Sequence, residues 1–403
     1  MSGISQSDPA AALKRAACDA VDALAGELLA TSRAIHAEPE LAFEEHKAAA
    51  RLTDDIERHG LAVERGACGL ATAFVSEFGT GGPCVALLAE YDALPGIGHA
   101  CGHNLIATAA LGATLALSRL GDALPGRVRL LGTPAEEGGG GKELMARKGA
   151  FQGVDAALMI HPAGVNLATT PTLAISRVEV AYHGRAAHAS AQPWDGVNAL
   201  DALVTAYQAI AQLRQHIRPT ERIHGIITDG GQASNVVPVR AAADFSVRAA
   251  DAKALAALKR RVEACFHGAA QTSGARLELA WDDVDYLDLV TSWPLANAFQ
   301  RNAESLGRTF MRLEDMPKGW AGSTDMGNVS QIVPAIHPLF AAAPPHVVIH
   351  HPDFATWAGS EMGDRAALEG AKALAMTAID FLTDAALRDE VARNFALARK
   401  EAA

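Results

Sequence analysis

A cysteine and a histidine one residue apart are the first residues of this chain with metal-binding chemistry. Cys101, Gly102 and His103 lie within AEYDALPGIGHACGHN, residues 89–104, at the end of the apolar run VALLAEYD, which predicts a buried parallel strand. A thiolate and an imidazole in a turn freed by the glycine can both face one ion or two adjacent ions. Open α/β sheets bind ligands at the carboxyl ends of their strands. Taken alone, the triplet favours a buried free cysteine beside a surface histidine, and a metal-binding loop becomes the better interpretation only with the ligand types that follow other strands.

Further ligand types follow other predicted strands. Glu136 and Glu137 come after the predicted strand at 128–132, and His161 ends the buried run AALMIHP. We expect these side chains, together with Asp92, to meet the cysteine at one edge of one sheet. Thiolate, imidazole and carboxylate form the ligand set for Zn, Mn or Co, and shared ligands allow two ions a few ångströms apart.

The two adjacent glutamates are expected to have different tasks. Neighbouring side chains on an extended backbone point apart, so one of Glu136 and Glu137 would bind metal and the other would move protons. The alternative is a solvated loop, as for most glutamate pairs. Here, however, four glycines at 138–141 follow, which would let the backbone pack close to a ligand.

The elements around these residues alternate between helix and strand. Helices are expected at 8–36, 43–59 and 103–119, and strands at 71–78, 84–91, 128–132 and 156–161. Such alternation predicts an α/β fold with a mainly parallel sheet flanked by helices.

The pattern changes after Pro171. A strand (172–183), a helix (196–215), two strands (222–229 and 237–248), a helix (about 255–266) and a strand (276–281) follow in turn. This order is typical of a ferredoxin-like α+β domain. We therefore expect residues 172–291 to form a domain inserted into a catalytic domain made of 1–171 and 292–403. The second catalytic segment should contain a helix from Pro294, a polar loop at GSTDMGN, an apolar run and two C-terminal helices.

Composition limits the possible partners and compartments. The 403 residues carry a net charge of -11, which argues against nucleic acid and disfavours anionic membranes. The start MSGISQSDPA lacks a signal-peptide pattern, and no apolar run approaches the length of a membrane span. Five scattered cysteines suit reduced thiols. The expected compartment is the cytoplasm.

Six ordered motifs carry a family resemblance: AEYDALPGIGHACGHN, GTPAEEGGGG, DAALMIHP, HGRAAHAS, GGQASNVVP and GSTDMGNVS. They resemble the metal-dependent amidohydrolases and aminoacylases related to the carboxypeptidase that cleaves folate. Within that family the chain is most similar to the subgroup of p-aminobenzoyl-glutamate hydrolase and dipeptidase-like aminoacylases. The resemblance covers about residues 35–385. It implies a zinc-exopeptidase-like catalytic domain with an inserted dimerisation and lid domain.

The resemblance also implies roles for individual residues. It makes Glu136 the general base and acid, and it implies metal ligands at Cys101, His103, Glu137 and His161.

A final histidine ligand is expected before a proline and a phenylalanine. In HHPDF this register favours His350, with His351 and His346 as alternatives. The family often has aspartate after the Cys-Gly-His triplet, where this chain has Asn104. We therefore expect Asp92 to be the partner of the His103 ring.

Within the insert, the resemblance implies that His188 stabilises the oxyanion and that Asn235 and Arg248 bind substrate. Their alternative is an ordinary surface position. Asp325 and His337 are expected to line the pocket. The family's insert commonly dimerises, so a homodimer is expected, in which a histidine of one subunit completes the partner's active site.

Together these observations predict a metal-dependent hydrolase with two divalent ions, Zn, Mn or Co. It would cleave the amide bond of an N-acyl amino acid, an aminobenzoyl amino acid or a small dipeptide. One alternative is an amidase with Cys101 as nucleophile and His103 or His161 as base. The other alternative is a metal-dependent binding protein that does not catalyse a reaction. The expected partners are small-molecule substrates, without nucleic acid or membrane.

Overall fold

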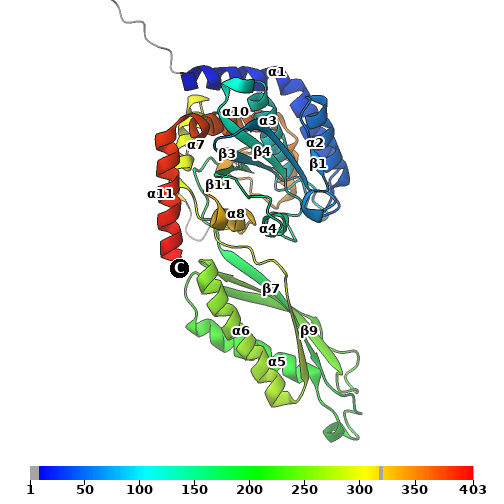
Figure 1. Ribbon diagram of the computed structural model, residues 1–403. Coiled ribbons are helices and arrows are strands. Elements are labelled where there is room, and N and C mark those ends of the chain that lie inside the picture. The colour runs from blue at the N-terminus through cyan, green and yellow to red at the C-terminus, as the bar shows by residue number, and fades with distance from the viewer. Residues whose placement is uncertain (1–8, 317–320, 403) are drawn as a thin grey trace, which may run out of the picture. The chain divides into compact units, whose positions relative to one another are not determined.

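The chain forms two compact units in the computed structural model, which describes residues 9–316 and 321–402. Unit 1 contains the residues up to Pro171 and those from Leu289 onward, and unit 2 is Thr172–Asp288 (Figure 1). The second boundary thus lies three residues before the one expected from the sequence. Each unit has its own hydrophobic core.

Unit 1 is built on a six-stranded sheet in the order β1-β2-β4-β3-β5-β11. The strands are β1 (Glu64–Arg65), β2 (Phe74–Thr80), β3 (Cys84–Ala89), β4 (Gly126–Gly132), β5 (Ala156–Leu158) and β11 (Ala335–Ile336). The four strands β4, β3, β5 and β11 run parallel, whereas β1 and β2 are antiparallel to their neighbours. The predicted mainly parallel sheet is confirmed.

Helices cover both faces of this sheet. They are α1 (Pro9–Ala37), α2 (His46–Arg58), α3 (His103–Ser118), α4 (Gly141–Arg147), α7 (Trp293–Ser305), α8 (Met326–Ile332), α9 (Pro352–Ala358), α10 (Glu361–Thr383) and α11 (Ala385–Ala402). Short 3₁₀ helices lie at η1 (Ala67–Gly69), η2 (Gly121–Ala123) and η5 (Leu313–Asp315). Among the described residues, none of these helices combines the length and apolar character needed to cross a bilayer.

Helix α3, which carries one of the predicted ligands at its start, is buried from His103 to Leu117. It packs against α1 and α10. At Gly112 the approach is so close that a Cβ would lie 2.9 Å from Leu28 and 3.0 Å from Ala371. The small residues of this helix therefore allow three helices to meet at short distance.

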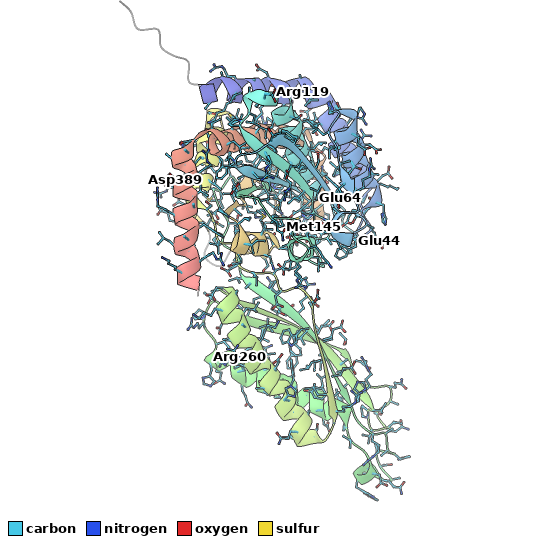
Figure 2. All side chains as sticks on the ribbon, in the orientation of Figure 1. Glu44, Glu64, Arg119, Met145, Arg260 and Asp389 are labelled. Carbon is cyan, nitrogen blue, oxygen red and sulfur yellow. The ribbon has the colours of Figure 1, made fainter. Side chains whose placement is uncertain are left out.

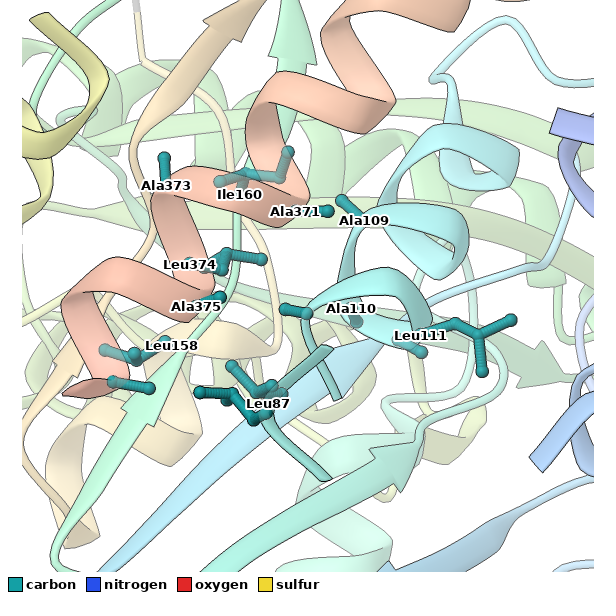
Figure 3. Close-up of a cluster of buried hydrophobic side chains, with 14 of the residues drawn as sticks. Leu87, Ala109, Ala110, Leu111, Leu158, Ile160, Ala371, Ala373, Leu374 and Ala375 are labelled. Atoms are coloured by element: carbon teal, nitrogen blue, oxygen red, sulfur yellow. The ribbon is translucent and has the colours of Figure 1, made fainter. Parts of the chain in front are cut away.

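Strand β3 is apolar on both faces because each face is covered. Leu87 faces α3 and α10 in one core, where Ala110 and Leu374 also pack (Figure 3). Leu88 faces the second core of the unit with Met145 of α4. The sheet is thus held rigidly between two helical layers, and its strand ends provide a fixed edge.

Three expected elements differ in the structure. The strand predicted at 156–161 stops at Leu158, and His161 begins a separate strand β6 (His161–Ala163), paired with β12 (Leu339–Ala341). The parallel ladder breaks opposite Pro338, which has no N–H to donate.

The helix expected from residue 43 begins at His46, since Phe43 has a φ of 63° that an α-helix cannot accommodate. GSTDMGN is only partly a loop, because α8 starts at its methionine, Met326.

Unit 2 has the predicted ferredoxin-like order of elements. They are β7 (Ala174–His183), η3 (Pro193–Asp195), α5 (Ala199–Leu213), η4 (Arg214–His216), β8 (Arg222–Asp229), β9 (Arg240–Ala249), α6 (Ala252–Ser273) and β10 (Arg276–Trp281). The sheet is antiparallel throughout in the order β10-β7-β9-β8. Helices α5 and α6 lie on the same face of it (Figure 1), and charged side chains such as Arg260 of α6 project outward (Figure 2). The opposite face carries no helix of this unit.

Candidate metal centre

The parallel strands of unit 1 deliver polar residues to one edge of the sheet. Asp92 follows β3, Glu136 and Glu137 follow β4, His161 follows β5, and His337 follows β11. Because the carboxyl ends of these strands lie side by side, residues far apart in sequence meet there.

Cys101 lies at the centre of the cluster. Its Sγ is 3.2 Å from Nε2 of His161 and 3.4 Å from Nε2 of His350. Two groups of potential ligands share this sulfur: Cys101 with His103 and His161, and Cys101 with Glu137 and His350. Within each group the donor atoms lie within 4.8 Å of one another. The geometry suits two neighbouring cations with the thiolate between them.

His350 joins this cluster, whereas His351 has another task. The Nδ1 atom of His351 accepts a hydrogen bond from the N–H of Asp353 and so caps α9. Neither His346 nor His351 belongs to a ligand group among the described residues. His350 itself has a φ of 63°, a conformation that costs a non-glycine residue energy and often marks a functional position.

The ring of His103 is oriented by Asp92. Oδ1 of Asp92 lies 3.0 Å from Nδ1 of His103, and its Oδ2 accepts a hydrogen bond of 2.9 Å from the N–H of Glu137. Asp92 therefore fixes one ligand ring and the backbone of another ligand. The expected Asp92–His103 contact is confirmed, and it directs Nε2 of the ring into the cluster.

Asn104 stands where the related family often has aspartate, and it does not contact the ligands by a described hydrogen bond. Its Nδ2 donates to Oγ of Ser32 at 3.0 Å and to the carbonyl of Ala358 at 3.1 Å. The side chain thus ties the start of α3 to α1 and to the end of α9.

The two adjacent glutamates have opposite protonation tendencies. Burial, with Glu90 and Glu137 nearby, raises the pKa of Glu136 well above its usual value. Burial opposes ionisation of Glu137 as well, but its hydrogen bond to His350 and the nearby His103 lower its pKa. Neighbouring carboxyls whose pKa values are driven apart are typical of acid–base and ligand roles in one site.

The loop that carries these glutamates is held in an unusual conformation. Ala135 has a φ of 59°, and its N–H donates to Oε1 of Glu45 at 2.9 Å. Glu45 is fully buried and also accepts hydrogen bonds from Thr72 and from the N–H of Phe43. Sequence reasoning missed Glu45, which lies about ninety residues before the loop it supports.

The following glycines pack against protein rather than against a ligand. A Cβ at Gly139 would lie 2.3 Å from the ring of Phe43, and one at Gly141 would lie 1.9 Å from the carbonyl oxygen of Pro134. The expectation that these glycines make room for a ligand is wrong at these two positions.

A buried lysine lies next to the cluster and was not predicted. Lys142 is fully buried, and its Nζ lies 2.6 Å from Oδ1 of Asp325 and pairs also with Oε1 of Glu90. Asp325, which was expected to line the pocket, thus binds Lys142. A lysine in a glycine-rich stretch resembles a solvated loop residue, so the sequence offers no signal for this network.

His337 is also buried beside the cluster, with its ring centroid 5.3 Å from that of His161. Neither ring nitrogen has a hydrogen-bond partner among the described residues. Burial and the neighbouring His161 lower the pKa of His337 well below its usual value, so the ring is neutral.

The three site residues predicted in the insert lie in unit 2. His188 is exposed, and its Nδ1 accepts hydrogen bonds of 3.3 Å from the N–H groups of Ser190 and Ala191. Asn235 is exposed in the neighbouring loop. Arg248 is half-buried in β9, where burial and Arg177 lower its pKa.

The cluster in unit 1 has the chemistry of a metal site. Nε2 of His103 is buried without a hydrogen-bond partner among the described residues, although such atoms are normally paired. Nδ1 of His161 donates to the carbonyl of Pro162 at 2.8 Å, which leaves its Nε2 lone pair facing Cys101. Sulfur, nitrogen and oxygen donors with buried negative charge fit divalent cations.

Comparison with known proteins gives consistent matches. The chain matches the profile of peptidase family M20/M25/M40 over residues 86–378. It is 42% identical to the Xaa-Arg dipeptidase of Mus musculus over 397 residues, which cover 95% of this chain and 92% of that protein. It is 38% identical to one subunit of the p-aminobenzoyl-glutamate hydrolase of Escherichia coli (strain K12) over 267 residues, 60% of this chain and 55% of that protein. A dinuclear metal-binding peptidase of Bacillus subtilis has a similar fold, with a TM-score of 0.68 at 22% identity over 90% of this chain and 99% of that one.

Proposed function

The chain belongs to peptidase family M20/M25/M40, and on this premise we propose that it is a metal-dependent hydrolase of amide bonds in dipeptides or N-acyl amino acids. The observation that carries the proposal is the pair of three-residue ligand groups that share Cys101. A relative over nearly the whole chain is a dipeptidase, and a structural neighbour binds two metal ions.

The proposed cofactors are two divalent metal ions, which would be zinc, manganese or cobalt. Cys101, His103 and His161 would hold one ion, and Cys101, Glu137 and His350 the other. Bound there, the ions would act as Lewis acids that polarise the scissile carbonyl and make water acidic near neutral pH.

Glu136 is the proposed proton carrier. Its raised pKa allows the carboxylate to take a proton from the attacking water and to hold it until the leaving amine accepts it. Oε2 of Glu136 lies 3.9 Å from Nε2 of His103, so the carboxylate is next to the ligand atoms. In unit 2, His188 is proposed to stabilise the oxyanion, and Asn235 and Arg248 to bind the substrate.

A cysteine nucleophile fits the same residues less well. Burial, with Glu137 nearby, raises the pKa of the Cys101 thiol well above its usual value. Nucleophilic cysteines instead have lowered pKa values and lie in electropositive surroundings. Such a mechanism would also leave Glu137 and His350 without a role.

Unit 2 contains a cavity whose charge favours a cationic substrate group. The cavity has a volume of about 500 Å³, and its charged lining residues lie on the face of the sheet opposite the core that α5 and α6 cover. Glu179, Asp244 and Asp282 line it together with Arg177 and His224. Burial and nearby arginines lower the pKa of His224, which keeps it neutral. The lining side chains alone, three carboxylates and one guanidinium, have a net charge of -2, and Arg214 and Arg248 lie close enough to act on His224.

The strand register arranges these charges in rows. Glu179 pairs directly with Asp244, a like-charge pair that is unfavourable without a cation between the two carboxylates. Arg177 pairs with Ser246, two residues further along β9 and so about 7 Å away. Ile226, 66% exposed and opposite Asp244, offers an apolar surface for a methylene chain.

We therefore propose that this cavity takes an amino acid with a cationic side chain, whose carboxylate faces Arg177. This favours Xaa-Arg substrates, after which one relative is named, over aminobenzoyl-glutamate, after which another is named. The extra glutamate carboxylate of the latter would face the pair of Glu179 and Asp244.

A homodimer is proposed through the edge of the unit 2 sheet. Strand β8 is an edge strand, and unpaired edges are normally covered. Exposed apolar side chains in the same unit include Trp194 (75%), Val239 (55%) and Ile227 (44%). Pairing of two β8 edges across a twofold axis would cover this strand.

A substrate panel tests the proposed function. The purified protein loaded with Mn²⁺, Zn²⁺ or Co²⁺ should release the amine from Ala-Arg and Ala-Lys, with little release from Ala-Glu or p-aminobenzoyl-glutamate. A chelator should abolish turnover. Asp244→Asn should raise KM for Ala-Arg about tenfold or more, because one charged contact is lost, and leave Ala-Ala nearly unchanged. Asp201→Asn, at an exposed position on α5, is the matched control. No turnover of any dipeptide or acyl amino acid with all three metals would refute the proposal.

A further inference from the structure

A third set of potential metal ligands overlaps with the two that share the cysteine. Glu90, His103 and Glu136 have donor atoms within 4.8 Å of one another, and all three side chains are buried. Oε2 of Glu90 lies 3.6 Å from Nε2 of His103, closer than Oε2 of Glu136 at 3.9 Å. This set consists of oxygen and nitrogen donors alone, which also suits divalent ions.

The two arrangements compete for one atom. Nδ1 of His103 is bound to Asp92, so only Nε2 remains to coordinate an ion. That atom can complete the group of Cys101 and His161 or the group of Glu90 and Glu136. The chain therefore needs a feature that decides which group His103 joins.

Lys142 provides a cation beside the competing carboxylate. Its Nζ pairs with Oε1 of Glu90, while Asp325 holds the lysine at two points: Oδ1 lies 2.6 Å from Nζ, and Oδ2 accepts a hydrogen bond of 2.9 Å from the backbone N–H. Glu90, Lys142 and Asp325 are all fully buried. Without the ammonium, two buried carboxylates would lack a counter-charge and would attract another cation.

We propose that Lys142 is a positioning residue that holds Glu90 away from metal coordination, so that His103 joins the centre containing Cys101. The covalently attached ammonium pairs with Oε1 of Glu90 and so weakens the attraction of this carboxylate for an ion bound with His103 and Glu136. This inference rests on the metal centre of the proposed function and adds to it a residue that controls where the metal binds.

Two double variants with the same charge change test this role. Lys142→Met/Asp325→Asn keeps the Glu90 carboxylate, and Lys142→Met/Glu90→Gln removes it. Each loses one positive and one negative charge in the same buried network, and thermal unfolding measures the stability of both. Glu90→Gln alone keeps Lys142 paired with Asp325 and is a further control.

Cobalt reports which ligands are used. Chelated protein is given two equivalents of Co²⁺, and the near-ultraviolet thiolate-to-cobalt band is measured per bound ion. In the variant that keeps Glu90, one ion should move to the set of oxygen and nitrogen donors, and the band should fall to about half of the wild-type value. The variant that lacks Glu90 should keep the full band.

The possible outcomes separate the two proposals. Equal and undiminished bands in both double variants, with wild-type metal content, would overturn the role of Lys142. If the wild-type protein itself binds Co²⁺ without a thiolate band, the metal centre at Cys101 fails, whatever the variants do.

Discussion

Oδ1 of Asp92 lies 3.0 Å from Nδ1 of His103, and both side chains are fully buried. The carboxylate accepts the Nδ1 proton, so Nε2 of the ring faces the cluster. The same carboxylate accepts the N–H of Glu137. One buried acid thus orients the ring of one candidate ligand and the backbone of another.

Replacing this acid should weaken metal binding. In Asp92→Asn the amide can donate to Nδ1 of His103, which would favour the tautomer with a proton on Nε2 that cannot bind metal. Metal affinity, measured by titration with a competing chelator, should fall about 10–100-fold. Asp122→Asn, at an exposed position, should leave it unchanged. Unaltered affinity in Asp92→Asn would show that the contact does not orient the ring.

The adjacent glutamates should differ when each loses its charge. Glu136→Gln should retain the metal but lose about 10²–10⁴-fold in kcat, because proton transfer is removed. Glu137→Gln should lose metal, since an amide is a poor substitute for a carboxylate ligand. Metal analysis and kinetics on both variants, with the surface change Glu44→Gln as control, check this assignment. Equal metal loss in the two variants would contradict it.

Metal binding should protect Cys101 from alkylation. A sulfur bound to metal has no lone pair available, so iodoacetamide should modify Cys101 only after chelation, and then slowly because burial raises the pKa of its thiol. Peptide mass spectrometry supplies two internal controls in the same protein: half-buried Cys18 should react in both states and buried Cys84 in neither. Fast modification of Cys101 with metal fully bound would exclude its role as a ligand.

The metal-free protein should lose stability in acid through His99. Burial lowers the pKa of His99 to about 3, and Nε2 of its ring bonds the carbonyl of Ile35. Unfolding exposes a ring with a pKa of about 6.5 that takes up a proton, so the stabilisation by the neutral ring is complete above pH 6.5 and is lost as the pH falls toward 3.

Replacement of this histidine isolates the effect. Between pH 6.5 and 5, His99→Gln should reduce the pH-dependent loss in free energy of unfolding by about 2 kcal/mol. Denaturant unfolding of the chelated protein measures it. His216→Gln, which changes an exposed histidine, should keep the wild-type slope. A wild-type slope in His99→Gln would rule out this source of acid sensitivity.

The proposed dimer can be tested by mixing two inactive variants. If His188 of one subunit completes the active site of its partner, a mixed dimer of His188→Ala and Glu136→Gln has one site with both defects and one with none. Activity should return toward half of the wild-type level per dimer. Subunit exchange is followed by mass spectrometry of the intact dimers. Complete exchange without activity would place His188 in the site of its own subunit or outside catalysis.

The convergence of the candidate ligands was the most predictable part of this site. Cys101 and His161 follow apolar runs that predict buried strands, and strand ends in such a sheet converge. The break at Leu158 was not predictable, because it depends on Pro338, which lies between β11 and β12 about 180 residues later.

The supporting residues escaped prediction for a similar reason. Glu90 and Lys142 have no local pattern that distinguishes them from surface charges, and their function depends on Asp325, which lies 183 residues after Lys142. Their burial becomes visible only when the end of β3 and the starts of α4 and α8 are brought together in space.

The two-segment construction of unit 1 also sets an order of events during synthesis. Cys101, Glu137 and His161 leave the ribosome before unit 2, whereas β11 and His350 follow it. At ordinary translation rates, the 117 residues Thr172–Asp288 delay the second segment by about 10 s. During that interval the nascent chain holds an incomplete ligand set and a sheet without its last strand. A metal ion bound before residue 350 emerges would therefore contact only the candidate ligands of the first segment, Cys101 among them. The second ion would bind later.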